Sequence, residues 1–87
     1  MENQAILEEL LGILEQNGVS LRREALGGGG SGLCKIKDNC VFFVDTQQMT
    51  IEAAQICAKA VNEILNIESI YIKPEVRSFI EKCIGVK

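Results

Sequence analysis

Apolar residues recur at helical spacing near the start of the chain. Over residues 4–17 they fall one, three and four positions apart, which places them on one stripe of a helix, while the glutamates lie off that stripe. Asn17 and Gly18 follow directly, and this pair is typical of a helix end. The sequence therefore predicts a helix that buries Ile6, Leu7, Leu10, Leu11 and Leu14.

Two further helices are expected in the second half of the chain. Thr50 is a favourable N-cap for a helix over about 50–65, and Pro74 suits the first position of a helix over about 74–84 that Gly85 ends. The apolar stripe of the earlier helix consists of Ala53, Ile56, Cys57, Ala60, Val61 and Ile64. The stripe of the later helix consists of Val76, Phe79, Ile80 and Cys83.

Alternating patterns predict the strands. Residues 19–25 alternate between apolar and polar side chains, as a half-buried strand does, and Ile70–Ile72 is a short apolar candidate. Residues 33–37 and 40–44 flank Asp38 and Asn39, which tolerate the positive φ of a tight turn and so predict a hairpin.

A two-residue turn at Asp38 and Asn39 sets the expected register of this hairpin. The expected opposite pairs are Lys37/Cys40, Ile36/Val41, Lys35/Phe42, Cys34/Phe43 and Leu33/Val44. We expect one face to point into the core, because it is apolar throughout and a slip by one residue would bury the lysines. That face carries Cys34, Ile36, Val41 and Phe43. The opposite face carries Leu33, Phe42 and Val44 among Lys35 and Lys37, with Cys40.

These elements give the order α-β-β-β-α-β-α with no internal repeat. The length of 87 residues fits one domain, so we expect a single α+β domain over residues 1–87. Its sheet should be rich in antiparallel pairs and its helices should pack on one face of that sheet.

The amino-acid composition narrows the range of functions that the chain can have. The chain has no histidine, which removes every mechanism that uses imidazole, and we expect no catalytic residue and no cofactor. The net charge of −3 and the lack of a basic run argue against nucleic-acid binding. No apolar run reaches the ~18 residues of a membrane span, and no cationic region precedes an apolar stretch near the start. We therefore expect no membrane contact and a cytoplasmic protein of bacterial type.

The four cysteines are best interpreted as small apolar residues. Cys34, Cys40, Cys57 and Cys83 show no C-x-x-C spacing, so no zinc or other metal site is expected. Cys34 and Cys40 should lie on opposite faces of the hairpin and form no disulfide. Cys40 is expected to be the more exposed thiol of the two, with lysines nearby.

The glycine-rich segment between two strands is the most unusual feature. It consists of Gly27, Gly28, Gly29, Gly30, Ser31 and Gly32. It is compatible with a passive flexible connector, and its G-G-G-G-S string also occurs in engineered linkers. It is equally compatible with an anion-binding nest of bare backbone amides, with Arg22 and Arg23 supplying positive charge, or with close approach of another backbone.

Residues 21–46 carry a resemblance. The string L-R-R-E-A-L-G-G-G-G-S-G-L-C-K-I-K-D-N-C-V-F-F-V-D-T is similar to the N-terminal part of ImmA/IrrE-type zinc metallopeptidases, whose next helix carries H-E-x-x-H. The helix expected over 50–65 has no histidine, so the resemblance implies a shared fold without the peptidase.

The chain also resembles small uncharacterised bacterial proteins that have a glycine-rich G-G-L-C segment and a C-terminal Y-x-x-P-E-V-R. In this chain the second motif is Tyr71, Pro74, Glu75, Val76 and Arg77. This resemblance brings no known activity with it.

The sequence favours a non-catalytic interaction module whose partner is a protein or a second copy of the chain. Leu33, Phe42 and Val44 are the expected interface, because an apolar strip left open on a small domain promotes association. The alternative is a binder of a small anionic ligand, such as phosphate or a nucleotide, that uses the glycine-rich segment with Arg22 or Arg23.

Overall fold

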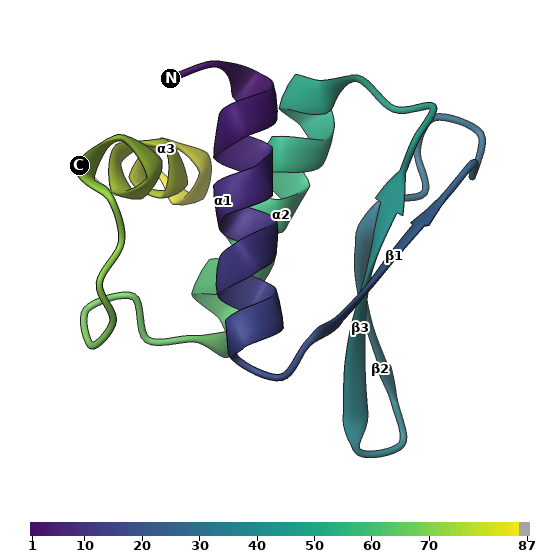
Figure 1. The fold of residues 1–87 in the computed structure, drawn as a ribbon, viewed down its shortest axis with the longest axis horizontal. Helices are drawn as coiled ribbons and strands as arrows, with labels where there is room; N and C mark the ends of the chain where they lie inside the picture. The colour runs from purple at the N-terminus through teal and green to yellow at the C-terminus, as the bar shows by residue number, and fades with distance from the viewer. Residues whose placement is uncertain (86–87) are drawn as a thin grey trace.

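Three helices and a three-stranded sheet follow one another in the order α-β-β-β-α-α (Figure 1). The computed structural model describes residues 1–85. The elements are α1 (Asn3–Gln16), β1 (Ser20–Glu24), β2 (Gly32–Ile36), β3 (Asn39–Asp45), α2 (Thr50–Ile64) and α3 (Pro74–Ile84). The α+β class and the three predicted helices are confirmed, whereas the strand expected at 70–72 does not form.

The sheet is mixed, because β3 lies at its centre with one parallel and one antiparallel neighbour. Its order is β1-β3-β2, with β1 parallel and β2 antiparallel to β3. The chain therefore leaves β1 at one edge, crosses to β2 at the other edge, and returns through the hairpin into the centre. The glycine-rich segment makes this crossing.

All three helices lie on one side of the sheet, and α1 and α2 form the layer next to it. Figure 1 shows α1 and α2 packed side by side next to the strands, with α3 on the far side of these two helices. All five residues of the predicted α1 stripe are buried. The core between the layers also contains Val19, Phe42, Val44, Ala53, Ala54, Cys57, Ala58, Ala60, Val61, Val76 and Ile80.

Helix α2 begins at Thr50, the first residue of the predicted range, but Thr50 is not its N-cap. Met49 is the N-cap, and no side chain caps the helix. Its buried face is wider than the predicted stripe, because Ala54 and Ala58 are also buried. Small side chains on two sides let α2 pack against α1 and α3 at once.

The two faces of the hairpin are inverted relative to the prediction. Phe42 is fully buried and Val44 is 6% exposed, so both belong to the core and not to an open interface. Leu33 packs against the same core. Ile36, expected inside, is 50% exposed, and Cys34 is exposed. The expected interface of Leu33, Phe42 and Val44 is therefore wrong.

The physical reason is that both faces of the hairpin contain several apolar side chains, so alternation alone does not select the core face. The lysines do not prevent burial of the Phe42 face, because the hairpin extends beyond the helices at its turn (Figure 1). Lys35 and Lys37 lie at this protruding end and are exposed.

The turn lies one residue earlier than predicted. Ile36 is opposite Asn39 and Cys34 is opposite Val41, so Lys37 and Asp38 form the turn. Lys37 adopts a φ of +55°, the left-handed conformation that such a turn requires. The shift preserves which residues share a face, and Cys34 and Cys40 remain on opposite faces with free thiols.

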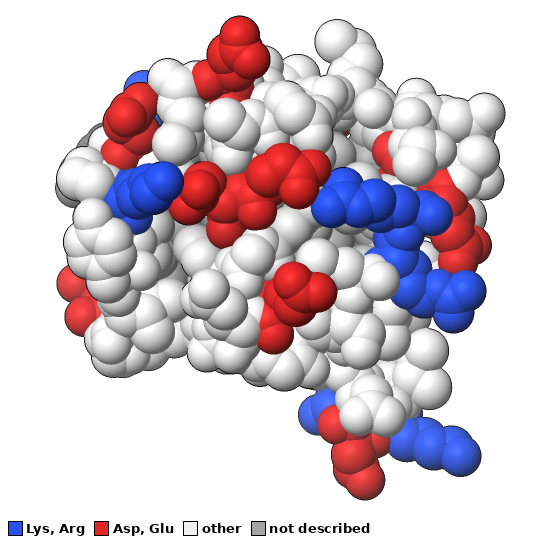
Figure 2. Space-filling model, viewed as in Figure 1, with Lys and Arg blue, Asp and Glu red and all other residues white. Residues whose placement is uncertain are grey.

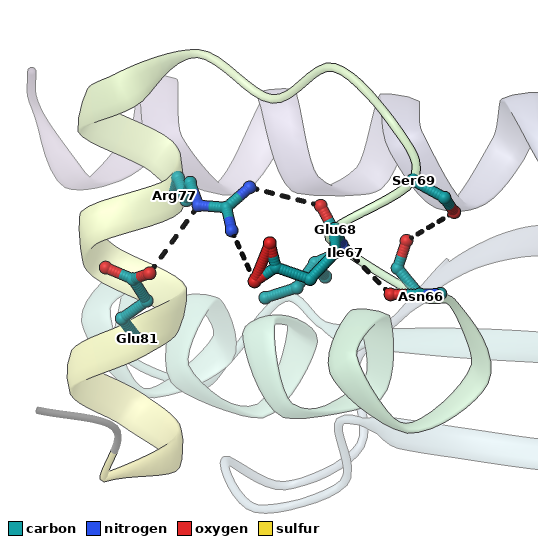
Figure 3. A network of polar contacts seen from close by, with 6 residues as sticks. All are labelled: Asn66, Ile67, Glu68, Ser69, Arg77 and Glu81. Carbon is teal, nitrogen blue, oxygen red and sulfur yellow. Dashed lines mark hydrogen bonds and ion pairs between the residues drawn. The ribbon is translucent and has the colours of Figure 1, made fainter.

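The connection from α2 to α3 replaces the predicted strand. Ile72 is buried but Tyr71 is 84% exposed, and no neighbouring strand pairs with this segment. Arg77 of α3 fixes the connection by donating to the carbonyl of Ile67 at 3.2 Å and to Glu68 at 2.7 Å (Figure 3). The hydrogen bond and charge of Glu68 raise the pKa of the Arg77 guanidinium.

Candidate functional site

The glycine-rich segment is organised around one carboxylate, that of Asp45 at the end of β3. Asp45 is 1% exposed. Its Oδ2 accepts hydrogen bonds from the amides of Gly28 at 2.6 Å and Gly30 at 2.9 Å. Its Oδ1 accepts hydrogen bonds from the amides of Leu26 at 3.0 Å and Gln47 at 2.9 Å. Four backbone donors therefore converge on a single buried anion.

These contacts control the ionisation of Asp45. Burial alone raises the pKa of a carboxyl group, because it disfavours the charged form. Here the amides of Gly30, Leu26, Gln47 and Gly28 outweigh burial and lower the pKa of Asp45 to about 2. The carboxylate is consequently ionised at neutral pH.

Two additional hydrogen bonds fix the segment. The Gly27 amide donates to Oε1 of Gln47 at 2.7 Å, and the Asp45 amide donates to the hydroxyl of Ser31 at 2.8 Å. Gly27 and Gly28 have φ values of +90° and +96°, which L-residues other than glycine adopt only with strain. The glycines are thus explained by a defined conformation and not by free flexibility.

This arrangement bears directly on the anion-binding hypothesis. The amides of Gly28 and Gly30 that would hold a phosphate already hold Asp45, and its negative charge opposes a second anion. Arg22 and Arg23 are both ion-paired: Arg22 with Glu24 at 2.9 Å, and Arg23 with Glu8 of α1 at 3.2 Å. The amides of Gly28 and Gly30 and the two arginines are therefore already engaged within the chain and are not free to hold a phosphate.

The predicted exposure of the thiols needs one correction. Cys34 is exposed and Cys40 is half-buried, so Cys34 is the more accessible of the two. Burial raises the pKa of Cys57 to about 12, as expected for a thiol that packs as an apolar side chain. Among residues 1–85, no three His, Cys, Asp or Glu side chains gather closely enough to hold a metal ion.

The sheet presents a second candidate site on the side away from the helices. Strand alternation and pairing place nine side chains on this outer face: Ser20, Arg22, Glu24, Cys34, Ile36, Asn39, Val41, Phe43 and Asp45. Val41 and Phe43 of the central strand are half-buried, while Ile36 and Cys34 of β2 are exposed. Figure 1 shows no helix on this side.

The outer face combines an apolar part with one ion pair. Its four apolar side chains come from β2 and β3. Apart from the buried Asp45, its charged side chains are Arg22 and Glu24 of β1, which neutralise each other. These apolar residues are the ones that the sequence predicted for the core. Sequence reasoning missed this site because it assigned them to the wrong side of the sheet.

Charge is distributed unevenly between the two layers. Residues 20–45 contain four Lys or Arg and three Asp or Glu, whereas the remainder of the chain contains five and nine. In Figure 2, carboxylates run across the middle over α1 while basic side chains gather over the strands. The sheet is therefore the less acidic side, where two copies of the chain would repel each other least.

Comparisons of the chain with protein-family models, curated proteins and solved structures found no match. The two resemblances read from residues 21–46 and from Tyr71 to Arg77 consequently stay expectations. Within residues 1–85, none of the helices has the length and apolar character needed to cross a membrane.

Proposed function

We propose that this chain is a non-catalytic interaction module that binds a second copy of itself through the outer face of its sheet. The observation that carries the proposal is the apolar group of Cys34, Ile36, Val41 and Phe43, whose members are exposed or half-buried on the side of the sheet that carries no helix. A three-stranded sheet with one such face exposed gains free energy by removing it from water.

A second copy fits this face because the face is complementary to itself. In a two-fold dimer, each residue of one copy meets a partner across the symmetry axis. Arg22 and Glu24 are neighbours on one edge, so Arg22 of each copy can pair with Glu24 of the other while the apolar parts meet. Apart from the buried Asp45, the charged residues of the face are Arg22 and Glu24, whose charges balance, so two copies approach each other there with little repulsion.

The size of the face limits the strength of the dimer. Three strands spaced about 4.8 Å apart and five to seven residues long offer a flat area of roughly 300 Å². A standard stable interface buries about 800 Å² on each partner, so we expect a dissociation constant of roughly 100 µM.

Sedimentation of the wild-type chain over a concentration series tests the proposal. The mass should rise from that of one chain to that of two as the concentration passes the expected constant. Ile36→Lys should hold the chain as a monomer, because it places a charge within the apolar part without disturbing the core. Tyr71→Lys is the matched control, because Tyr71 is 84% exposed and lies outside the sheet.

A wild-type chain that stays monomeric at about 1 mM would overturn the proposal. A dimer that Ile36→Lys leaves intact would show that a different surface associates, and would overturn it as well. Circular dichroism of each variant would establish that the fold is retained.

A further inference from the structure

A groove between α2 and α3 forms a separate feature of the surface. It has a volume of about 370 Å³ and no strand contributes to it. Gln55 and Lys59 come from α2, and Phe79, Lys82 and Cys83 come from α3. One lysine thus stands on each helical wall.

The charge of this groove is unusual for an acidic chain. Its lining contains two lysines and no carboxylate, although the whole chain has a net charge of −3. Within the described residues, all three arginines and Lys73 have carboxylate partners, whereas Lys59 and Lys82, like Lys35 and Lys37 of the hairpin, form no ion pair.

The positive charge reaches the base of the groove. Burial raises the pKa of the Cys83 thiol, and the positive charge of Lys59 acts in the opposite direction. Lys59 therefore lies close enough to act electrostatically on a residue of α3. Two uncompensated like charges on facing walls favour an anion between them.

The base of the groove is apolar. Phe79 and Cys83 are half-buried, and both pack against the core on their inner side. Their outer side remains available to a ligand. Lys59, Lys82 and Gln55 are exposed, so the groove is open to solvent along its walls.

We infer that this groove binds an acidic amphipathic segment of a partner protein. An apolar side chain of the segment packs on Phe79, and its carboxylates pair with Lys59 on one wall and Lys82 on the other. The charge complementarity identifies the partner as acidic. An open groove would leave much of a small molecule in water, whereas a segment lying between the helices reaches both walls.

A direct binding measurement tests this inference. The probe is a fluorescein-labelled peptide that repeats Glu-Leu-Leu-Glu, and fluorescence anisotropy follows its binding to the full chain. Saturable binding that weakens as salt rises is expected, because part of the attraction is between charges. The matched peptide with Gln in place of each Glu should bind at least tenfold more weakly.

Charge-neutral variants locate the site. Lys59→Gln and Lys82→Gln should each weaken binding about threefold, and the double variant about tenfold or more. Lys35→Gln with Lys37→Gln is the matched control, because it removes the same charge from the hairpin, away from α2 and α3. Its affinity should equal that of the wild type.

Equal weakening by the hairpin variant would show a general effect of net charge and would overturn the inference. Equal binding of the Gln peptide, or no saturable binding at about 1 mM protein, would do the same. The variant Ile36→Lys should bind the peptide normally. Failure of the chain to dimerise through its sheet and failure of the groove to bind the peptide can therefore be told apart.

Discussion

The side chain of Asp45 lies at the end of the central strand, where backbone amides from both flanking loops meet it. Strand alternation places it on the same side of the sheet as Phe43, so the segment that it holds closes one end of the outer face. Buried carboxylates are costly unless fully hydrogen-bonded, and here four amides supply that need.

Replacement of Asp45 by asparagine should therefore destabilise the protein strongly. The amide group of asparagine keeps one acceptor oxygen but turns an NH₂ toward backbone N–H donors, which leaves buried donors without partners. We expect Tm to fall by about 10 °C or more in a thermal unfolding experiment. Asp38→Asn, in the exposed hairpin turn, changes the same charge and should leave Tm nearly unchanged.

The lowered pKa of Asp45 also predicts how stability depends on acid. A carboxyl whose pKa is depressed on folding adds stability above its unfolded value, near 3.8, and that stability is lost as pH falls toward about 2. The difference in unfolding free energy between the wild type and Asp45→Asn should therefore shrink between pH 4 and pH 2. Urea unfolding at several pH values measures this, and a constant difference would contradict the assigned role.

At the scale of elements, the glycine-rich segment contains glycines whose backbone conformation requires glycine and others that a larger residue can replace. Gly28 has a φ of +96°, whereas Gly29 has no positive φ and an added Cβ there would meet nothing within 4 Å. The segment is therefore a shaped crossing between two sheet edges, in which individual positions have different requirements.

Two single substitutions test this distinction. Gly28→Ala should destabilise the protein by about 1 kcal/mol, because alanine must adopt a left-handed conformation. Gly29→Ala should be neutral or stabilising by about 0.4–1 kcal/mol, because alanine restricts only the unfolded chain. Urea unfolding of both variants gives the comparison. Equal effects would indicate that the segment is a passive connector.

Helix α1 contains a glycine that its own packing does not require. Gly12 lies in the helix interior, and an added Cβ there would meet no atom within 4 Å. Gly12→Ala should stabilise the protein by about 0.5–1 kcal/mol through helix propensity. A loss of stability in urea unfolding would show that α1 has a closer neighbour at this position than the structure describes.

The helices were predictable because their signals are local. The α1 stripe ends at Asn17 and Gly18, and α3 is bracketed by Pro74 and Gly85. The sheet was harder, because its parallel pairing of β1 with β3 joins segments that are distant in sequence. Cys40 to Val44 are five consecutive apolar residues, so their pattern fits burial of either face. Ile70–Ile72 has the composition of a strand, but it does not pair with either edge of the sheet.

The candidate sites were less predictable than the fold. The glycine-rich segment was recognised, but Asp45, the partner of Gly28 and Gly30, lies fifteen or more residues away from them in sequence. A single aspartate after an apolar strand is common, so only the folded arrangement shows that it is the acceptor. The outer face was identified as apolar from the sequence, yet assigned to the core.

At the scale of the whole molecule, the helices cover one side of the sheet and leave the other open. Acidic residues gather over the helices, while basic side chains gather over the strands (Figures 1 and 2). The sheet, the pair α1 and α2, and then α3 follow one another, which leaves the outer face free for the proposed contact between two copies and keeps it apart from the groove between α2 and α3.

Isotope-filtered NOE spectroscopy tests this account most directly, because it detects contacts only between differently labelled copies. A mixture of ¹³C-labelled and unlabelled chains at about 1 mM should show intermolecular contacts from the Phe43 ring to the methyl groups of Val41 and Ile36. The Ile36→Lys variant should lose them. Absence of intermolecular contacts in the wild type, or contacts that arise from α3 in place of the sheet, would contradict the account.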